Sequence, residues 1–77
     1  MMAPGQVETY SGSRLHEGPR RFCWQEEWLE VRRILARWYE PEALHFKVEA
    51  ADGRVYQLEY HQSTDHWEVC LWPGNRP

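Results

Sequence analysis

The stretch from residue 44 to residue 71, LHFKVEAADGRVYQLEYHQSTDHWEVCL, decides the fold of this 77-residue chain. Apolar and polar residues alternate along it in three runs, which is the pattern of strands with one face in a core and the other in solvent. The inward positions are Leu44, Phe46 and Val48, then Tyr56, Leu58 and Tyr60, and then Trp67, Val69 and Leu71. Turn-forming residues separate the runs, so the stretch predicts an antiparallel meander of three strands.

The register of this meander follows from the rule that residues directly opposite each other point to the same face. A two-residue Asp-Gly loop would oppose Val48, a core residue, with Gln57, a surface residue. A three-residue loop over residues 51–53 opposes Val48 with Tyr56 instead, and its last position suits a glycine. At the next turn, a four-residue loop over residues 62–65 opposes core residues throughout. We therefore predict loops of three and four residues.

The outer face of the meander then carries two histidines and two glutamates close together. They are Glu59, His61, His66 and Glu68. Two imidazoles and two carboxylates are ligands that suit zinc, and glutamates directly opposite each other repel unless a positive group lies between them. The alternative is a solvated strand face, because the spacing of the two histidines matches no zinc motif. These four residues are the candidate metal ligands, although the sequence by itself predicts no cofactor.

The segment from residue 25 to residue 40 fits two kinds of element. Its apolar residues recur at helical spacing, its glutamates come early, its arginines come late and a proline follows, all of which favour a helix. Read as a strand, it places Leu29 and Val31 on one face. Ile34 and Trp38 fall on the other face, so the strand needs a β-bulge near its two adjacent arginines. On pattern alone the helix is favoured.

A longer line of aromatic and apolar residues resembles a small bacterial domain of unknown function. The residues that carry the resemblance are Phe22-x-Trp24, Leu29-x-Val31-x-x-Ile34-Leu35-x-x-Trp38, Phe46-x-Val48, Asp52-Gly53-x-Val55-Tyr56-x-Leu58 and Trp67. A similar segment forms the C-terminal end of ImuB-type proteins, the polymerase-like partners of an error-prone repair polymerase. The resemblance covers residues 18–72 and implies that residues 22–24 and 29–38 are two strands of a hairpin.

With that resemblance, we expect a mostly β fold, an antiparallel curled sheet of five or six strands or a small barrel. The alternative is an α+β fold with a helix over residues 26–39 packed on a three-strand meander. The expected core residues are Phe22, Trp24, Val31, Trp38, Phe46, Val48, Tyr56, Leu58, Tyr60, Trp67 and Val69. Residues 1–20 read as a largely flexible segment with at most one short edge strand, near Val7 and Tyr10. Residues 21–72 read as a single β domain and residues 73–77 as a flexible tail.

Two cysteines, Cys23 and Cys70, bear on the compartment of the protein. Since no secretory signal precedes them, we expect two buried thiols in a reducing environment rather than a disulfide, and a cytoplasmic protein. No apolar run approaches the roughly 20 residues of a membrane span, so we expect no membrane partner.

Charge and motif content narrow the function. A net charge of −3 argues against strong binding to nucleic-acid phosphates. The sequence has no glycine-rich phosphate loop, nucleophile elbow or framed pair of acids, so we expect no enzyme. Trp28 and Trp72 fall outside the inward positions of their strands, and arginines lie near the first of them. The candidate partner-binding residues are therefore Trp28, Arg32, Arg33 and Trp72.

We therefore expect a non-catalytic protein-interaction module that binds another protein through these residues or through an exposed strand edge. It would be a monomer or a homodimer. The resemblance implies a link to DNA damage tolerance. One alternative is a weak binder of single-stranded nucleic acid, which requires Arg21, Arg32, Arg33 and Arg37 to share one face. The other is a metal-binding module that uses His61 and His66.

Overall fold

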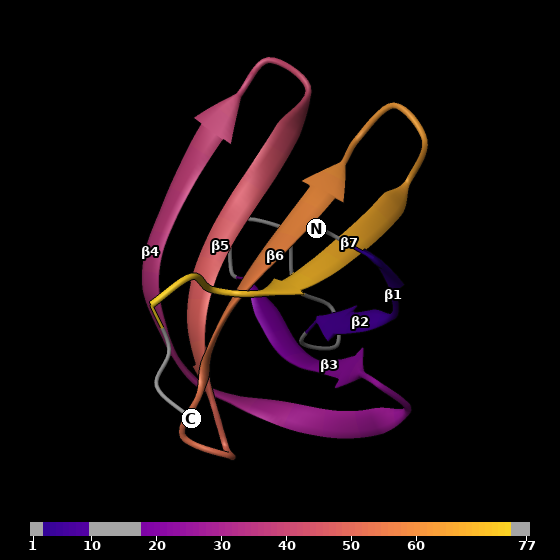
Figure 1. Ribbon diagram of the computed structural model, residues 1–77. Coiled ribbons are helices and arrows are strands. Elements are labelled where there is room, and N and C mark those ends of the chain that lie inside the picture. Colours follow the sequence, from indigo (N-terminus) through magenta and orange to yellow (C-terminus); the bar gives the residue numbers. More distant parts are fainter. Residues whose placement is uncertain (1–2, 10–17, 75–77) are drawn as a thin grey trace.

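The computed structural model describes residues 3–9 and 18–74, and in these residues it contains strands and turns but no helix (Figure 1). No element there is a helix long and apolar enough to cross a membrane. The strands are β1 (Ala3–Gly5), β2 (Val7–Thr9), β3 (Pro19–Trp24), β4 (Glu27–Glu40), β5 (Ala43–Ala50), β6 (Val55–His61) and β7 (His66–Leu71). They form one antiparallel sheet in the order β1-β7-β6-β5-β4-β3-β2. The expected curled antiparallel β fold is confirmed, and the alternative with a helix over residues 26–39 is wrong.

The short strands β1 and β2 join the two ends of this sheet. Only Gln6 separates them along the chain, yet β1 pairs with β7 and β2 pairs with β3. The backbone N–H of Cys23 donates to the carbonyl of Gln6 at 2.8 Å, which continues the pairing between them. The sheet therefore curls into a half-barrel, and its N-terminal segment connects the two ends (Figure 1).

The strands β1 and β2 lie within residues 1–20, which were predicted to be largely flexible. β2 contains Val7, where a short edge strand was expected, whereas Tyr10 lies outside the described residues. β3 begins at Pro19, two residues before the predicted start of the domain. Of the predicted tail over residues 73–77, residues 73 and 74 are described.

Both predicted loop lengths of the meander are confirmed. Val48 lies opposite Tyr56 across β5 and β6, and Tyr60 lies opposite Trp67 across β6 and β7. Gly53 closes the first loop with a φ of 84°, a left-handed conformation that costs glycine little. Because core residues face core residues in both hairpins, the alternation of the sequence sets the register.

The long strand β4 contains two bulges instead of the single one that was expected. The register with β5 shifts between Val31 and Arg33, as predicted, and again between Ile34 and Ala36. The first bulge turns Ile34 toward the core, where it packs with Val31. The second bulge restores the original alternation, so Trp38 points to the outer face. The expectation that Trp38 belongs to the core is therefore wrong, because one bulge was counted where the strand has two.

The β3–β4 hairpin turns through two residues, Gln25 and Glu26, which follow Trp24 and precede its partner Glu27. Their φ angles are 50° and 71°, the paired left-handed conformation of a type I′ turn. Glycine and asparagine favour this turn, so Gln25 and Glu26 hold it against their own backbone preference.

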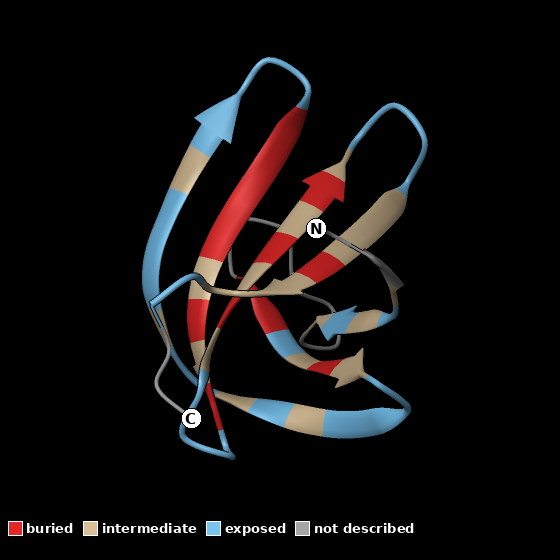
Figure 2. Ribbon diagram, viewed as in Figure 1, coloured by how far each residue is buried: buried red, intermediate tan, exposed pale blue. Residues whose placement is uncertain are grey.

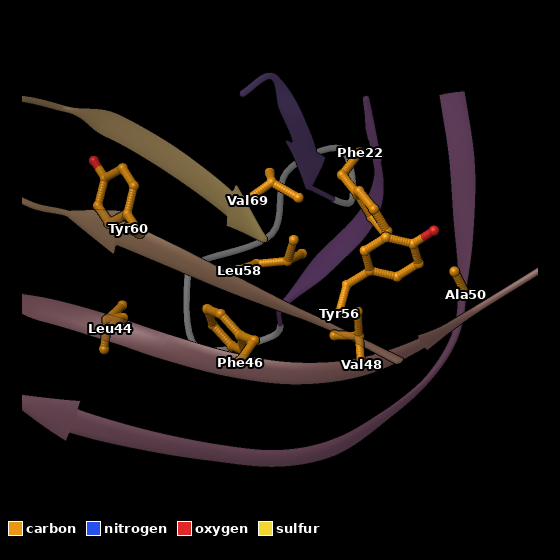
Figure 3. Close-up of a cluster of buried hydrophobic side chains, with 9 residues drawn as sticks. All are labelled: Phe22, Leu44, Phe46, Val48, Ala50, Tyr56, Leu58, Tyr60 and Val69. Atoms are coloured by element: carbon orange, nitrogen blue, oxygen red, sulfur yellow. The ribbon is translucent and has the colours of Figure 1, made fainter. Parts of the chain in front are cut away.

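The core fills the inside of the half-barrel, and Figure 3 shows its side chains pointing toward one another from β3, β5, β6 and β7. It consists of Phe22, Leu44, Phe46, Val48, Ala50, Tyr56, Leu58, Tyr60 and Val69, with Val7, Trp24, Leu29, Val31, Ile34, Trp67 and Leu71 partly buried against it. Both buried tyrosines keep their hydroxyls satisfied. Tyr56 donates to Asp52 at 2.7 Å and Tyr60 donates to Asp65 at 2.6 Å, so the aromatic rings are buried without leaving an unpaired polar atom.

Candidate functional site

The predicted partner-binding residues of β4 fall into two separate groups. Trp28 is 42% exposed. The guanidinium of Arg21 lies over its ring, 4.9 Å from the ring centroid. Arg32 and Arg33 instead both lie close to the carboxylate of Glu49. Nε of Arg33 lies 2.7 Å from Oε1 of Glu49, and Nη1 of Arg32 lies 3.9 Å from Oε2 of the same residue. The structure therefore places Trp28 beside Arg21 rather than in a patch with Arg32 and Arg33.

Trp72, the remaining candidate, belongs to an aromatic group on the outer face. Its ring meets Trp38 edge to face at 6.4 Å, and Nζ of Lys47 lies 4.4 Å from the Trp72 centroid. Trp38 in turn stacks in parallel on the imidazole of His45 at 5.0 Å. Trp38, His45 and Lys47 were not predicted from the sequence to lie in this group. The cross-strand pairs Trp38–His45 and Ala36–Lys47 would have indicated it once the two bulges were known.

The second half of β4 forms an open strand edge. Among the described residues, β3 pairs only with residues 27–30 of this strand, whereas β5 pairs with it from residue 31 to residue 40. Residues 32–40 therefore have a strand neighbour on one side only. Leu35 is 43% exposed and Tyr39 is 67% exposed along this edge, and Figure 2 shows most of this half of the strand as exposed.

The four candidate metal ligands do come together, as the predicted register required. Glu59 lies opposite Glu68, and His61 lies opposite His66. Nε2 of His61 is 2.8 Å from Oε1 of Glu59 and 3.7 Å from Oε1 of Glu68. Nε2 of His66 is 3.5 Å from Oε2 of Glu68. The four side chains are partly shielded from solvent, so their charges interact more strongly than those of a fully solvated strand face.

His45, which the sequence analysis did not single out, lies beside this cluster and is only 6% exposed. Its Nδ1 is 3.2 Å from Oε2 of Glu59 and equally far from Nε2 of Gln57. Its Nε2 lies 2.7 Å from Oε1 of Glu40, but not in the geometry of a hydrogen bond. Nε2 of His45 and Nε2 of His61 are both buried without a hydrogen-bond partner among the described residues. An unpaired buried polar atom is destabilising, so these two nitrogens mark the cluster as unusual.

Both cysteines are free thiols and are half-buried rather than fully buried. Cys70 lies on β7 opposite Gln57. Burial, together with the negative charge of Glu59, raises the pKa of the Cys70 thiol. Cys70 therefore stays protonated at neutral pH, which is the unreactive form of a cysteine.

The arginines required for a nucleic-acid surface do not converge. Arg21 is paired with Glu8 at 2.7 Å, and this hydrogen bond lowers the pKa of the Glu8 carboxyl. Arg37 lies opposite Phe46 and holds its guanidinium 5.7 Å from that ring, on the core side of β4. Arg33 pairs with the outer face of β5. No common face therefore collects them into the continuous basic groove that a single strand follows.

Comparisons with protein-family models, with curated proteins and with solved structures found no match to this chain. The resemblance to the C-terminal segment of ImuB-type proteins therefore stays a prediction. The function is inferred below from the geometry of the sheet.

Proposed function

We propose that this chain is a non-catalytic protein-interaction module that takes an extended strand of a partner protein along the open edge of β4. One observation carries the proposal: residues 32–40 pair with β5 but have no strand neighbour on their other side among the described residues. Such an edge presents a row of backbone N–H and C=O groups that a strand from another chain can pair with.

The two halves of this edge differ in regularity. The bulges at Arg32 and Leu35 interrupt the ladder, whereas residues 36–40 pair with β5 without a shift. Bulges limit indiscriminate pairing along an edge, so the regular segment from residue 36 to residue 40 is the docking segment. Tyr39 lies within it and exposes two thirds of its surface, and exposed tyrosines are frequent anchors in protein interfaces.

The edges of β7 and β3 are already paired, which supports the choice of β4. β7 is paired with β1, and β3 is paired with β2, so the N-terminal segment occupies both of those edges. A partner strand that added there would have to displace existing pairing, whereas at residues 36–40 it would displace no strand of the described part of the chain.

The test compares partner capture by the wild-type chain and by a Leu35→Lys, Tyr39→Lys double variant. Exposed lysines at a strand edge oppose the addition of another strand. Thr64→Lys, in the exposed β6–β7 loop, is the control because it adds one of the two lysine charges outside β4. Thermal unfolding of each variant shows whether the fold is retained.

We expect the wild type and the Thr64→Lys control to capture the same protein from lysate of the source organism, and the edge variant to lose it. The capture is done with and without DNA damage, because the resemblance implies a partner in damage tolerance. Backbone amide signals of residues 36–40 should shift when the purified partner is added to the labelled chain. Equal capture by all three proteins, or no specific partner in any of them, would refute the proposal. A second copy of this chain as the captured protein would make the edge a homodimer interface.

A further inference from the structure

We infer that the outer face of β6 and β7 is a binding site for a zinc-class divalent metal ion, held by Glu59, His61 and Glu68 with water as the fourth ligand. This site is separate from the β4 edge, so the inference does not depend on the proposed interaction function.

The possible ligand atoms lie close enough together to bind one ion. Glu59, His61 and Glu68 each offer one ligand atom, and these atoms all lie within 4.8 Å of one another. Ligand atoms in a tetrahedral zinc site with bonds of about 2.1 Å lie about 3.4 Å apart. The measured separations from Nε2 of His61, 2.8 Å to Glu59 and 3.7 Å to Glu68, lie on either side of that value. The three ligand atoms therefore lie at separations close to those of a zinc site.

A second argument is the unpaired imidazole nitrogen at the centre of the cluster. Nε2 of His61 is buried and lies between two carboxylates, 2.8 Å from Oε1 of Glu59, yet it makes no hydrogen bond of good geometry with any described residue. A neutral imidazole nitrogen presents a lone pair there, and a metal ion can accept it. The same ion would separate Glu59 from Glu68, which face each other directly across the ladder and otherwise repel.

The charge and chemical type of the ligands select the metal. The two carboxylates together carry a charge of about −2, which a divalent cation balances. Mixed nitrogen and oxygen ligands suit zinc and its neighbours in the transition series. Calcium and magnesium prefer oxygen ligands alone, so the histidine argues against them.

The surroundings hold the Glu59 carboxylate in place. Nδ1 of His45 lies 3.2 Å from Oε2 of Glu59, which leaves Oε1 directed at His61. The imidazole of His45 is itself buried and covered by the parallel ring of Trp38. Groups of this kind, which orient a ligand from behind, strengthen metal binding. His45 therefore acts as a positioning residue for the site.

The test is a zinc titration of the full chain by calorimetry, with competition against a chromophoric chelator, and a parallel titration with cobalt. We expect one zinc ion per chain, a rise in the unfolding temperature with zinc concentration, and the visible absorption bands of four-coordinate cobalt. The Glu59→Gln, His61→Ala double variant should lose this binding. The Glu42→Gln control, at an exposed glutamate in the β4–β5 turn, should keep it.

A His45→Asn variant separates the positioning role from general stability. It should bind zinc about 10- to 100-fold more weakly while it keeps the cobalt absorption bands, because the ligands themselves are unchanged. Thermal unfolding in the absence of zinc establishes that each variant is folded. Wild-type protein that fails to bind zinc at one ion per chain would overturn the inference. An affinity that is equal in the wild type and the Glu59→Gln, His61→Ala variant would overturn it as well. The cluster would then be a set of ion pairs with protonated histidines.

Discussion

The hydroxyl of Tyr56 offers a direct test of how this small core tolerates a polar group. The side chain is fully buried, and its ring packs edge to face against Phe22 at 4.9 Å and Trp24 at 5.5 Å. Its hydroxyl donates to Oδ2 of Asp52 at 2.7 Å. Burial, and then the hydrogen bond and negative charge of Asp52, raise the pKa of Tyr56 from 10.0 to about 12. Replacing Tyr56 with Phe removes the titrating group and keeps the ring.

The size and sign of the effect follow from this pKa. The folded protein holds the Tyr56 proton more tightly than the unfolded chain, so the contribution to stability is fully present below about pH 10 and is lost as the pH rises toward about 12. Each pKa unit corresponds to about 1.4 kcal/mol, so a shift of two units makes the total loss about 2–3 kcal/mol. About half of it should be lost by pH about 11. At neutral pH the Phe variant should be less stable by about 1 kcal/mol, because one hydrogen bond to an exposed carboxylate is lost.

The assay is urea unfolding followed by tryptophan fluorescence, for wild type and Tyr56→Phe, from neutral pH to about pH 12. The stability advantage of the wild type should disappear and then reverse as the pH rises, because the unfolded wild-type chain gains stability by ionising Tyr56 and the Phe variant has no such group. Tyr39→Phe is the matched control, since its ring is largely exposed. A difference in unfolding free energy between wild type and Tyr56→Phe that stayed constant across this pH range would refute the reasoning.

Three further substitutions test the packing and the backbone, all measured by urea unfolding. Leu58→Ala, at a fully buried position, should lower the unfolding free energy by about 2–5 kcal/mol, and a loss below about 0.5 kcal/mol would contradict the assigned core. Glu26→Gly should raise it by about 0.5–1 kcal/mol, because glycine adopts the φ of 71° without strain; no gain would mean that the turn is not left-handed. Gly18→Ala should destabilise by at most about 1 kcal/mol more than Gly53→Ala, because the atom that the added Cβ meets is the movable end of the Ile34 side chain. Both positions have positive φ, but only at Gly18 would the added Cβ overlap the Ile34 side chain. An extra loss above about 3 kcal/mol at Gly18 would mean that the Ile34 side chain cannot move aside.

The proposed docking edge of β4 and the proposed metal site on β6 and β7 belong to the same sheet. Curling brings the N-terminal segment against both β7 and β3, whereas the second half of β4 keeps an open edge among the described residues. The register of β5, β6 and β7 places His45, Glu59 and Glu68 opposite one another on the outer face. The edge variants and the metal-site variants share no residue, so each proposal can fail without affecting the other.

The meander was predictable from the sequence because strand alternation is a local property. Each run of six to eight residues carries its own period of two. The two loop lengths then followed from matching core positions across each turn, as the pairs Val48–Tyr56 and Tyr60–Trp67 show. The cluster of Glu59, His61, His66 and Glu68 could be predicted for the same reason, since it depends only on the register of one hairpin.

β4 could not be predicted in the same way, because its sequence is compatible with a helix and with a strand. Its apolar residues fit helical spacing, and only the pairing with β3 and β5 makes it a strand. The two bulges depend on that pairing, and they determine that Ile34 faces the core while Trp38 covers His45. Nothing in the residues of β5 therefore indicated that His45, at an outward-facing position, is buried.

The sequence by itself determined the meander, its register and the grouping of the four metal-ligand candidates, because these depend on alternation over a few neighbouring residues. Only the tertiary structure decided the state of β4, the contacts of Arg32 and Arg33 with Glu49, and the pairing of the N-terminal segment with β7 and β3. Each of these depends on contacts between residues far apart in the chain. Such contacts form only when the whole sheet curls, and their energies outweigh the local preferences that a sequence pattern records.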